Sequence, residues 1–178
     1  MNIFKTRNDL INSLGTNTVI CELGVFQGDF SEVLFHHNPK ELHLIDPFVG
    51  AFWSGDKDGL NMQYANLPES YYNLQNKYST HKHVHIHRGY SYDVLINFPD
   101  CYFDFMYIDA DHTYGGVKND LTLCKQKTKI NGIIAGHDYH ESRFPGVFQA
   151  VKEFCDTHDL LISFLTNDGR PSFGIINL

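Results

Sequence analysis

Glu22-Leu-Gly-Val-Phe-Gln-Gly28 joins an apolar run at 18–23, TVICEL, to a segment of helical pattern that begins near Phe30. Gly24 permits a tight turn and the close approach of a ligand, because a Cβ there would collide with a molecule lying across the strand end. Gly28 removes bulk where the helix begins, and the free N–H groups of the first helical turn then point at the pocket. This strand–turn–helix unit predicts an α/β fold with a binding site at the turn, although such turns also occur without a ligand.

The rest of the chain alternates short apolar runs with longer amphipathic segments. Six further runs predict strands, at 42–45, 84–87, 103–108, 132–135, 161–165 and 172–176. Helical patterns occur at 30–37, within 68–78, and at 92–97, 114–127 and 147–158. The order predicts one domain over 1–178: a doubly wound, mostly parallel seven-stranded sheet with an antiparallel last strand. In such sheets ligands bind outside the carboxyl ends of the strands, so we expect the functional residues there.

Composition narrows the classes of partner and the location. The net charge is −7 and no block of lysine or arginine interrupts it, which argues against nucleic acid as a partner. No stretch approaches the roughly 18 apolar residues of a membrane helix, so we expect no membrane association. The four cysteines lie far apart and form no CxxC pair, which predicts reduced thiols in a cytoplasmic protein.

The spacing of the glycine segment and a later acid together suggest the kind of ligand. The pattern is E-x-G-x-x-x-G, and Phe26 stands where the second glycine of a dinucleotide fingerprint would admit a pyrophosphate. A ligand without a pyrophosphate therefore fits better. Asp46, in the string LHLIDP, follows Gly24 by 22 positions, where an acid can accept hydrogen bonds from two ribose hydroxyls. The alternative for Asp46 is a loop residue that begins an Asp-Pro turn.

From about Thr18 to Phe154 the chain resembles the class I S-adenosylmethionine-dependent methyltransferases. ELGVFQG is similar to their first motif, with Glu22 in the acidic position, and Asp46 lies where their ribose-binding acid is found. The resemblance implies that the two glycines lie against the methionine part of the cofactor and that RGYSYDVL flanks the adenine. The expected cofactor-binding residues are Glu22, Gly24, Phe26, Gly28, Asp46, Gly89, Tyr90, Ser91 and Asp109.

Two more strand ends carry acids. The runs at 103–108 and 132–135 are followed by the strings IDADHTY and GHDYH, so Asp109 and Asp138 can converge although they lie 29 positions apart. Two carboxylates could hold a divalent cation such as Mg²⁺, which lowers the pKa of a substrate hydroxyl. His112 is positioned to remove that proton. The alternative is that these acids cap the following helices, and for Asp111 we favour the capping role.

These strings are similar to those of the metal-dependent O-methyltransferases, which carry D-A-D-K and D-N at the same places. The resemblance implies that Asp109 and Asp138 are metal ligands and that His112 replaces a lysine base. Tyr139 replaces the asparagine ligand, and His137 or His140 could substitute for it, although imidazole favours zinc, iron or nickel over magnesium. We take Asp109, Asp138 and His140 as the candidate metal ligands. A group of small methyltransferases from sugar, capsule and natural-product gene clusters carries closer versions of both strings.

Two further segments have unusual composition. His81, His83, His85 and His87 alternate along one stretch and would share one strand face, but nothing in the sequence supplies closing ligands for a metal. The stretch 48–72 contains Phe52, Trp53, Tyr64, Tyr71 and Tyr72 between glycines and acids. It could form a lid or an acceptor-binding wall, or equally an aromatic cluster that packs the loop down.

The sequence thus predicts transfer of a methyl group from S-adenosylmethionine to an oxygen of a small polar acceptor, such as a sugar or a natural product. His112, Asp109 and Asp138 are the expected catalytic group, and the acceptor is the expected partner. The sequence leaves a homodimer open. Two alternatives are a nicotinamide-dependent oxidoreductase, against which Phe26 counts, and a non-catalytic binding protein on the same fold.

Overall fold

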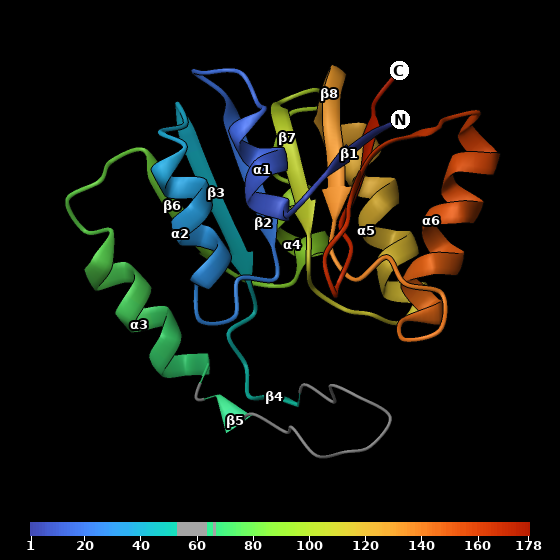
Figure 1. Ribbon diagram of the computed structural model, residues 1–178. Helices are drawn as coiled ribbons and strands as arrows, with labels where there is room; N and C mark the ends of the chain where they lie inside the picture. The colour runs from blue at the N-terminus through green and yellow to red at the C-terminus, as the bar shows by residue number, and fades with distance from the viewer. Residues whose placement is uncertain (53–63, 66) are drawn as a thin grey trace.

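The computed structural model describes residues 1–52, 64–65 and 67–178, and its centre is an eight-stranded sheet (Figure 1). Along the sheet the strands are β1 (Asn2–Phe4), β9 (Ile162–Thr166), β10 (Phe173–Ile176), β8 (Thr128–Gly136), β7 (Phe103–Ile108), β2 (Val19–Leu23), β3 (Glu41–Asp46) and β6 (Val84–Arg88). β10 runs antiparallel to both of its neighbours, and the other pairs are parallel. A separate pair, β4 (Ala51–Phe52) and β5 (Tyr64–Ala65), lies beyond the carboxyl end of β3. The predicted doubly wound sheet with an antiparallel last strand is confirmed, but it has eight strands rather than seven.

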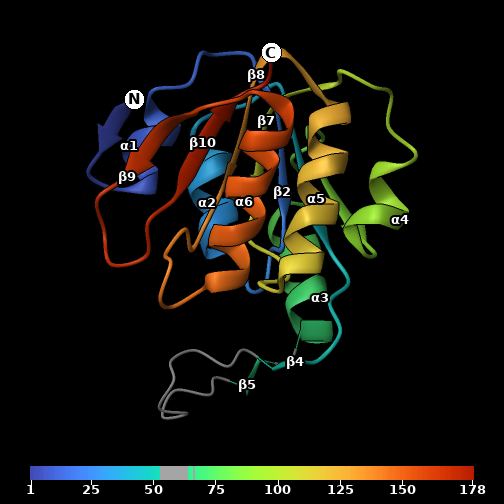
Figure 2. The ribbon, with the colours of Figure 1, turned by 90° about the vertical axis from the view of Figure 1, so that its right-hand side faces the viewer.

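Helices cover both faces of this sheet (Figure 2). Each face has its own apolar core. One face is covered by α1 (Arg7–Asn12), α2 (Asp29–His36) and α3 (Leu67–Lys77), and the other by α4 (Ser91–Leu95), α5 (Tyr114–Lys127) and α6 (Pro145–His158). All five residues of β2 are buried, because a central parallel strand has helices above and below it. This explains why its sequence is a continuous apolar run interrupted only by Glu22.

The eighth strand and an additional helix lie in the first twelve residues, where the sequence pattern predicted no element. β1 has only three residues and pairs with β9 at the edge of the sheet, which is too short for a periodic signal. α1 begins at a capping box, in which the Thr6 side chain accepts a hydrogen bond from the Asp9 N–H and the Asp9 carboxylate accepts one from the Thr6 N–H. The string TRND before Leu10 and Ile11 is the sequence signature of this cap.

The histidine stretch does not form a single face. β6 begins at Val84, and His81 and His83 precede it in a turn where their rings pack against Phe35 of α2. His85 and His87 lie in the strand and pack on the opposite face, against His43 of β3. The prediction that four histidines share one face was therefore wrong, because the turn breaks the alternation.

The helices and the cysteines can be compared with the expectations about membranes and thiols. None of the helices in the described ranges is long and apolar enough to cross a bilayer. The four cysteines are free; three are buried, and Cys101 is exposed.

Candidate active site

Four neighbouring strands end at the same level of the sheet, so their carboxyl ends form one row. Leu23 of β2 pairs with Ile45 of β3 and with Ile108 of β7, and Ile108 pairs in turn with Gly136 of β8. The residues that follow therefore lie side by side. Backbone hydrogen bonds continue the ladder past the strand ends: the Gly24 N–H donates to the Ile45 carbonyl, the Asp109 N–H to the Leu23 carbonyl and the His137 N–H to the Ile108 carbonyl.

A crevice with two halves opens over this row. One pocket, of about 550 Å³, is lined by Arg7, Glu22, His112, His137 and Asp138, and the other, of about 520 Å³, by Asp46, Tyr90, Ser91 and Asp120. Both pockets are also lined by Gly24, Phe26, Asp109 and Ala110, so they meet at the end of β2 and β7. The prediction that a glycine turn, Asp46 and two further acids surround one crevice thus agrees with the geometry.

The glycine turn is fixed by the protein itself. Gly24 has a φ of 87°, and a Cβ there would lie 2.1 Å from the carbonyl oxygen of Asp109. Gly24 is thus required by the close approach of β2 to β7, whereas the sequence argument attributed the need to a ligand. Gly28 is the N-cap of α2, also with a left-handed φ, and a Cβ there would meet the side chain of Leu74. Phe26, at the tip of the turn, also has a positive φ of 55°.

Asp46 braces the turn. Its Oδ2 accepts hydrogen bonds from the N–H groups of Val25 and Phe26 at 2.9 and 3.0 Å, and its Oδ1 accepts one from the Phe48 N–H at 2.6 Å. Asp46 as a whole is 6 % exposed. A carboxylate has about four acceptor positions, so Asp46 has room for one further donor, such as one ribose hydroxyl, while it keeps these three bonds.

Glu22 lies at the floor of the larger pocket. It is buried and accepts a hydrogen bond from the Ser31 hydroxyl. Burial raises its pKa to about 8, although the Ser31 hydrogen bond works against this. At neutral pH Glu22 is therefore largely protonated, and a cation placed in this half of the crevice would favour its ionised form.

The segment predicted to flank an adenine forms one wall of the smaller pocket. Tyr90 and Ser91 line that pocket, whereas Gly89 lies beside it, where a Cβ would contact the Val94 side chain of α4 at 2.9 Å. The Ser91 hydroxyl donates a hydrogen bond to Asp120 of α5. Burial raises the pKa of Asp120 to about 6. The sequence analysis did not single out Asp120, although an acid three residues after Val117 and four before Cys124 lies on the buried stripe of that helix.

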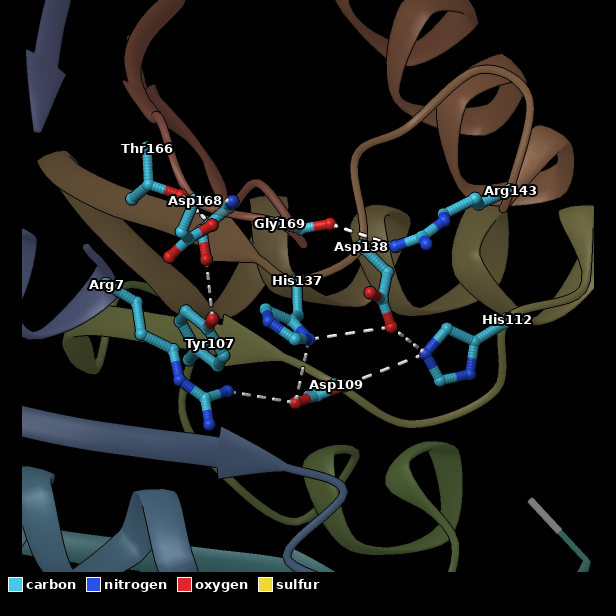
Figure 3. Close-up of polar contacts among 11 residues, drawn as sticks. Arg7, Tyr107, Asp109, His112, His137, Asp138, Arg143, Thr166, Asp168 and Gly169 are labelled. Carbon is cyan, nitrogen blue, oxygen red and sulfur yellow. Dashed lines mark hydrogen bonds and ion pairs between the residues drawn. The ribbon is translucent and has the colours of Figure 1, made fainter. Parts of the chain in front are cut away.

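The larger pocket contains a ring of alternating carboxylates and imidazoles (Figure 3). His112 Nε2 lies 2.9 Å from Asp138 Oδ2 and 3.7 Å from Asp109 Oδ1. His137 Nδ1 lies 3.5 Å from Asp109 Oδ2 and 3.5 Å from Asp138 Oδ2. Arg7 of α1 extends the ring, because its guanidinium lies 3.4 Å from Asp109 and packs 4.3 Å over the Phe30 ring. The predicted convergence of Asp109, Asp138 and His112 is thus seen in the structure.

Each member of this ring changes the protonation of its neighbours. Burial favours the neutral imidazole of His112 and His137, but hydrogen bonds and charge from Asp109 and Asp138 outweigh burial and raise both pKa values to about 9. For the carboxyl of Asp138, burial is likewise outweighed by the two imidazoles, which lower its pKa to about 2. Asp138 is 1 % exposed and has a left-handed φ of 57°, and its buried Oδ1 has no hydrogen-bond partner among the residues that the structure describes. An unsatisfied buried acceptor in a site of this charge points to a missing donor or cation.

Asp109, His137 and Asp138 could hold that cation, since their ligand atoms lie within 4.8 Å of one another. The structure brings His137 into this group in place of His140, whose ring lies near the Ser142 hydroxyl. Sequence reasoning named His137 only as a substitute, although it is the first residue after β8 and the strand-end rule points to it. Asp111 is not the cap of α5 that we expected: the N-cap is Thr113, whose hydroxyl accepts a hydrogen bond from the Gly116 N–H, and Asp111 accepts hydrogen bonds from the N–H and hydroxyl of Thr113.

Part of the aromatic stretch is packed down beside the crevice. Phe48 is fully buried, and the Tyr71 ring lies 5.2 Å from it, which matches the packing alternative for these two residues. Tyr72 is exposed. Trp53 lies outside the described residues, and Phe52 and Tyr64 are described only as members of the β4–β5 pair.

Several solved structures share this fold. The O-methyltransferase NovP is 18 % identical with a TM-score of 0.68, and the alignment covers 96 % of this chain and 79 % of NovP. The N-methyltransferase NodS from Bradyrhizobium japonicum WM9, solved in complex with S-adenosyl-l-homocysteine, is 12 % identical with a TM-score of 0.65, over 96 % and 85 % of the two chains. The precorrin-6y C5,15-methyltransferase from Geobacter metallireducens GS-15 is 12 % identical with a TM-score of 0.66, over 96 % of this chain and 87 % of that one. These likenesses establish the fold.

The sequence itself identifies the family. Comparison with curated proteins found no significant match. A family model described as a methyltransferase domain matches residues 21–139, which run from β2 through the Asp–His ring. Because this match spans about two thirds of the 178 residues, the chain belongs to the methyltransferase-domain family.

Proposed function

We propose that this protein transfers a methyl group from S-adenosylmethionine to an oxygen of a small polar acceptor. The observation that carries the proposal is the two-part crevice, in which one half presents Asp46 and Ser91 and the other presents the Asp–His ring. S-adenosylmethionine would supply a methyl group made electrophilic by its sulfonium. The acceptor oxygen would be activated by the chain's own side chains.

The smaller half of the crevice suits the adenosine part of this cofactor. Asp46 has one free acceptor position for a ribose hydroxyl, and Ser91 and Asp120 offer polar atoms on a wall that also contains Tyr90 and Tyr92. Glu22 lies in the other half, where a positively charged amino-acid group would favour its ionised form. Phe26 occupies the tip of the turn, so the chain lacks the second glycine that lets a pyrophosphate approach.

The larger half of the crevice suits a polar acceptor. An oxygen nucleophile must lose a proton, and the ring offers carboxylate and imidazole acceptors for it. The 3.7 Å separation between His112 Nε2 and Asp109 Oδ1 is the longest side of the ring, and it is where we place an acceptor hydroxyl. His112 would take the proton in its neutral form, with the lone pair on Nε2. A cation bound to Asp109 and Asp138 would favour that form, because it would offset the two carboxylates that otherwise raise the pKa of His112 to about 9. Arg7 and Arg170 also line this half, which adds donors for a polar molecule.

The ring can balance its two carboxylate charges in two ways. Two imidazolium groups can do so, or one divalent cation can, with His137 neutral and bound to it. Mixed carboxylate and imidazole ligands suit manganese, iron or zinc better than magnesium. Metal analysis of the purified chain, and turnover before and after treatment with a chelator, distinguish these two states.

The proposal is tested by cofactor binding and by turnover in the same preparations. Calorimetry should detect S-adenosylmethionine and its demethylated product and no nicotinamide dinucleotide. Assays of methyl transfer to a panel of hydroxylated acceptors, such as sugars, should identify the acceptor class. His112→Ala should lower turnover by roughly 10²- to 10⁴-fold and leave the cofactor Kd within about twofold, since we place His112 against the acceptor and the cofactor against Asp46, Ser91 and Glu22.

His36→Ala is the matched control, because His36 is an exposed histidine on α2. It should behave like the wild type. Binding of a nicotinamide cofactor in place of S-adenosylmethionine would overturn the proposal. So would a His112→Ala variant that turns over normally.

A further inference from the structure

A second group of imidazoles and a carboxylate lies away from the crevice, between β3 and the edge strand β6. His43 pairs directly with His85 in the register of the two strands, and Ile45 pairs with His87, so these side chains share one face of the sheet. The His43 and His85 rings stack at 4.7 Å, and the His43 and His87 rings at 5.4 Å. Glu41, at the start of β3, lies on the same face two residues before His43. We call Glu41, His43, His85 and His87 the edge cluster.

Three members of the edge cluster present atoms that can converge on one ion. Ligand atoms of Glu41, His43 and His85 all lie within 4.8 Å of one another. His43 Nε2 lies 3.3 Å from Glu41 Oε2. Two ligands of a tetrahedral zinc ion with bonds of about 2.0 Å are separated by about 3.3 Å, so this pair already has the required spacing. The His85 side chain is only partly buried and can adjust to complete the set.

The remaining contacts are those that orient metal ligands in known sites. His43 Nδ1 lies 3.1 Å from His87 Nε2, so a proton on Nδ1 leaves Nε2 with a lone pair that faces Glu41. The Tyr102 hydroxyl donates a hydrogen bond of 2.5 Å to Glu41 Oε2. A ligand imidazole whose second nitrogen is hydrogen-bonded, and a ligand carboxylate that accepts a hydrogen bond, are usual features of metal sites. Lys40 lies 3.9 Å from the other oxygen of Glu41, but its side chain is 57 % exposed and can turn away.

From this geometry we infer that the edge cluster binds one transition-metal ion of the zinc type through Glu41, His43 and His85, with water in the fourth position. Two imidazoles and one carboxylate form a ligand set that zinc accepts. Magnesium and calcium, which prefer oxygen ligands, fit poorly. The ion joins β3 to β6, the last strand of the sheet, and so stabilises that edge. The site is separate from the crevice and does not depend on the proposed methyl transfer.

The test is titration of the chelator-treated full-length chain with Zn²⁺, followed by calorimetry and by NMR of the imidazole nitrogens. His85→Gln should weaken this site by more than about 100-fold, because it removes a ligand, and Tyr102→Phe should weaken it by about tenfold. The wild type should show a change at His43 Nε2 on zinc addition. That change should be absent in His85→Gln.

Two further variants separate this site from the ring and from folding defects. His137→Gln removes a candidate ligand in the crevice and should leave zinc binding at His43 intact. His81→Gln changes a histidine that packs on the other face, against Phe35, and should bind zinc like the wild type. Undiminished zinc binding in His85→Gln would overturn the inference. So would loss of the His43 signal change in His137→Gln.

Discussion

The Asp–His ring and the edge cluster are both built from carboxylates and imidazoles on the same sheet. The histidines of the ring are charged near neutral pH, whereas His43 of the edge cluster is neutral. In the ring, two carboxylates alternate with two imidazoles, and the pKa of His112 and His137 rises to about 9. In the edge cluster, one carboxylate serves three imidazoles, and burial together with the neighbouring imidazoles lowers the pKa of His43 to about 4. The pKa of His87 is lowered for the same reasons.

The difference shows that the ratio of carboxylates to imidazoles, more than burial alone, decides whether these histidines carry charge. The His43 side chain is 7 % exposed and the His112 side chain 26 %, so both lose much of their hydration. Only His112 gains two carboxylate partners in exchange. The ring histidines are therefore charged near neutral pH, whereas His43 of the edge cluster is neutral and has a lone pair for a metal ion.

Removing a carboxylate from the ring should have the largest effect. Asp138→Asn keeps the shape of the side chain but leaves His112 and His137 to share Asp109 alone. We expect turnover to fall by about 10³-fold, while cofactor affinity changes little, because Asp138 lines only the larger half of the crevice. Steady-state kinetics and calorimetry measure the two quantities. The control is Asp156→Asn, at an exposed position of α6; equal turnover in the two variants would show that the ring is not catalytic.

The fold and the strand-end residues could be predicted because each depends on local pattern. Seven strands appear as apolar runs, and a parallel sheet brings its carboxyl ends together, so Asp109 and Asp138 converge. β1 and α1 could not be predicted by periodicity, because three and six residues do not establish a period. Arg7, which α1 carries into the crevice, was therefore missed.

His137 could have been preferred to His140 from the sequence, because it is the first residue after β8. The edge cluster could not have been found in the same way. The edge cluster requires knowing that β6 lies beside β3 in a register that pairs His43 with His85. The sequence argument found no closing ligands for the histidine stretch because they come from the neighbouring strand.

The comparison also predicts the pH dependence of stability in chelator-treated protein. The raised pKa of His112 and His137 stabilises the fold below their unfolded value of about 6.5, and this contribution is lost as pH rises toward 9. The lowered pKa of His43 acts in the other direction, since the fold loses stability as pH falls from about 6.5 to 4. We expect each of these histidines to contribute about 3 kcal/mol across its own range, with the loss from His43 on the acid side and the losses from both His112 and His137 on the alkaline side.

Urea unfolding across this pH range measures the free energy of unfolding as a function of pH. A different variant should reduce the pH dependence on the acid side and on the alkaline side. His137→Gln should flatten the alkaline side, and His43→Phe the acid side. If His43→Phe leaves the loss of stability at acid pH unchanged, the pKa of His43 is not lowered in the folded protein.

Glu22 is a buried carboxylate that has no imidazole as a partner within the described ranges, so it can be compared with Asp138. Its pKa is raised to about 8 whereas that of Asp138 is lowered to about 2. The wild type is therefore stabilised by protonated Glu22 at low pH and loses that contribution as pH rises from 4.5 to 8. Glu22→Gln avoids a cost of about 3 kcal/mol at pH 7 but weakens the hydrogen bond from Ser31 by about 1 kcal/mol.

We therefore expect Glu22→Gln to be slightly less stable than the wild type at pH 4 and about 2 kcal/mol more stable at pH 7. Urea unfolding at pH 4 and at pH 7 measures this change in the relative stability of the variant and the wild type. Ser31→Ala, which removes only the hydrogen bond, should be destabilising at both. A Glu22→Gln variant that is destabilised equally at both pH values would show that Glu22 is ionised throughout.

Arg7 gives the smallest effect and tests how far the ring extends. Its guanidinium pairs with Asp109 and lies over the Phe30 ring, and its side chain is 27 % exposed. Lys77 makes a similar pair with Glu32 at 3.1 Å, but both of those side chains are about half exposed. Arg7→Gln should cost about 1 kcal/mol of stability, and Lys77→Gln should cost less than about 0.5 kcal/mol, because exposed pairs contribute little. Equal losses of stability in the two variants would show that the ion pair between Arg7 and Asp109 contributes no more than an exposed pair.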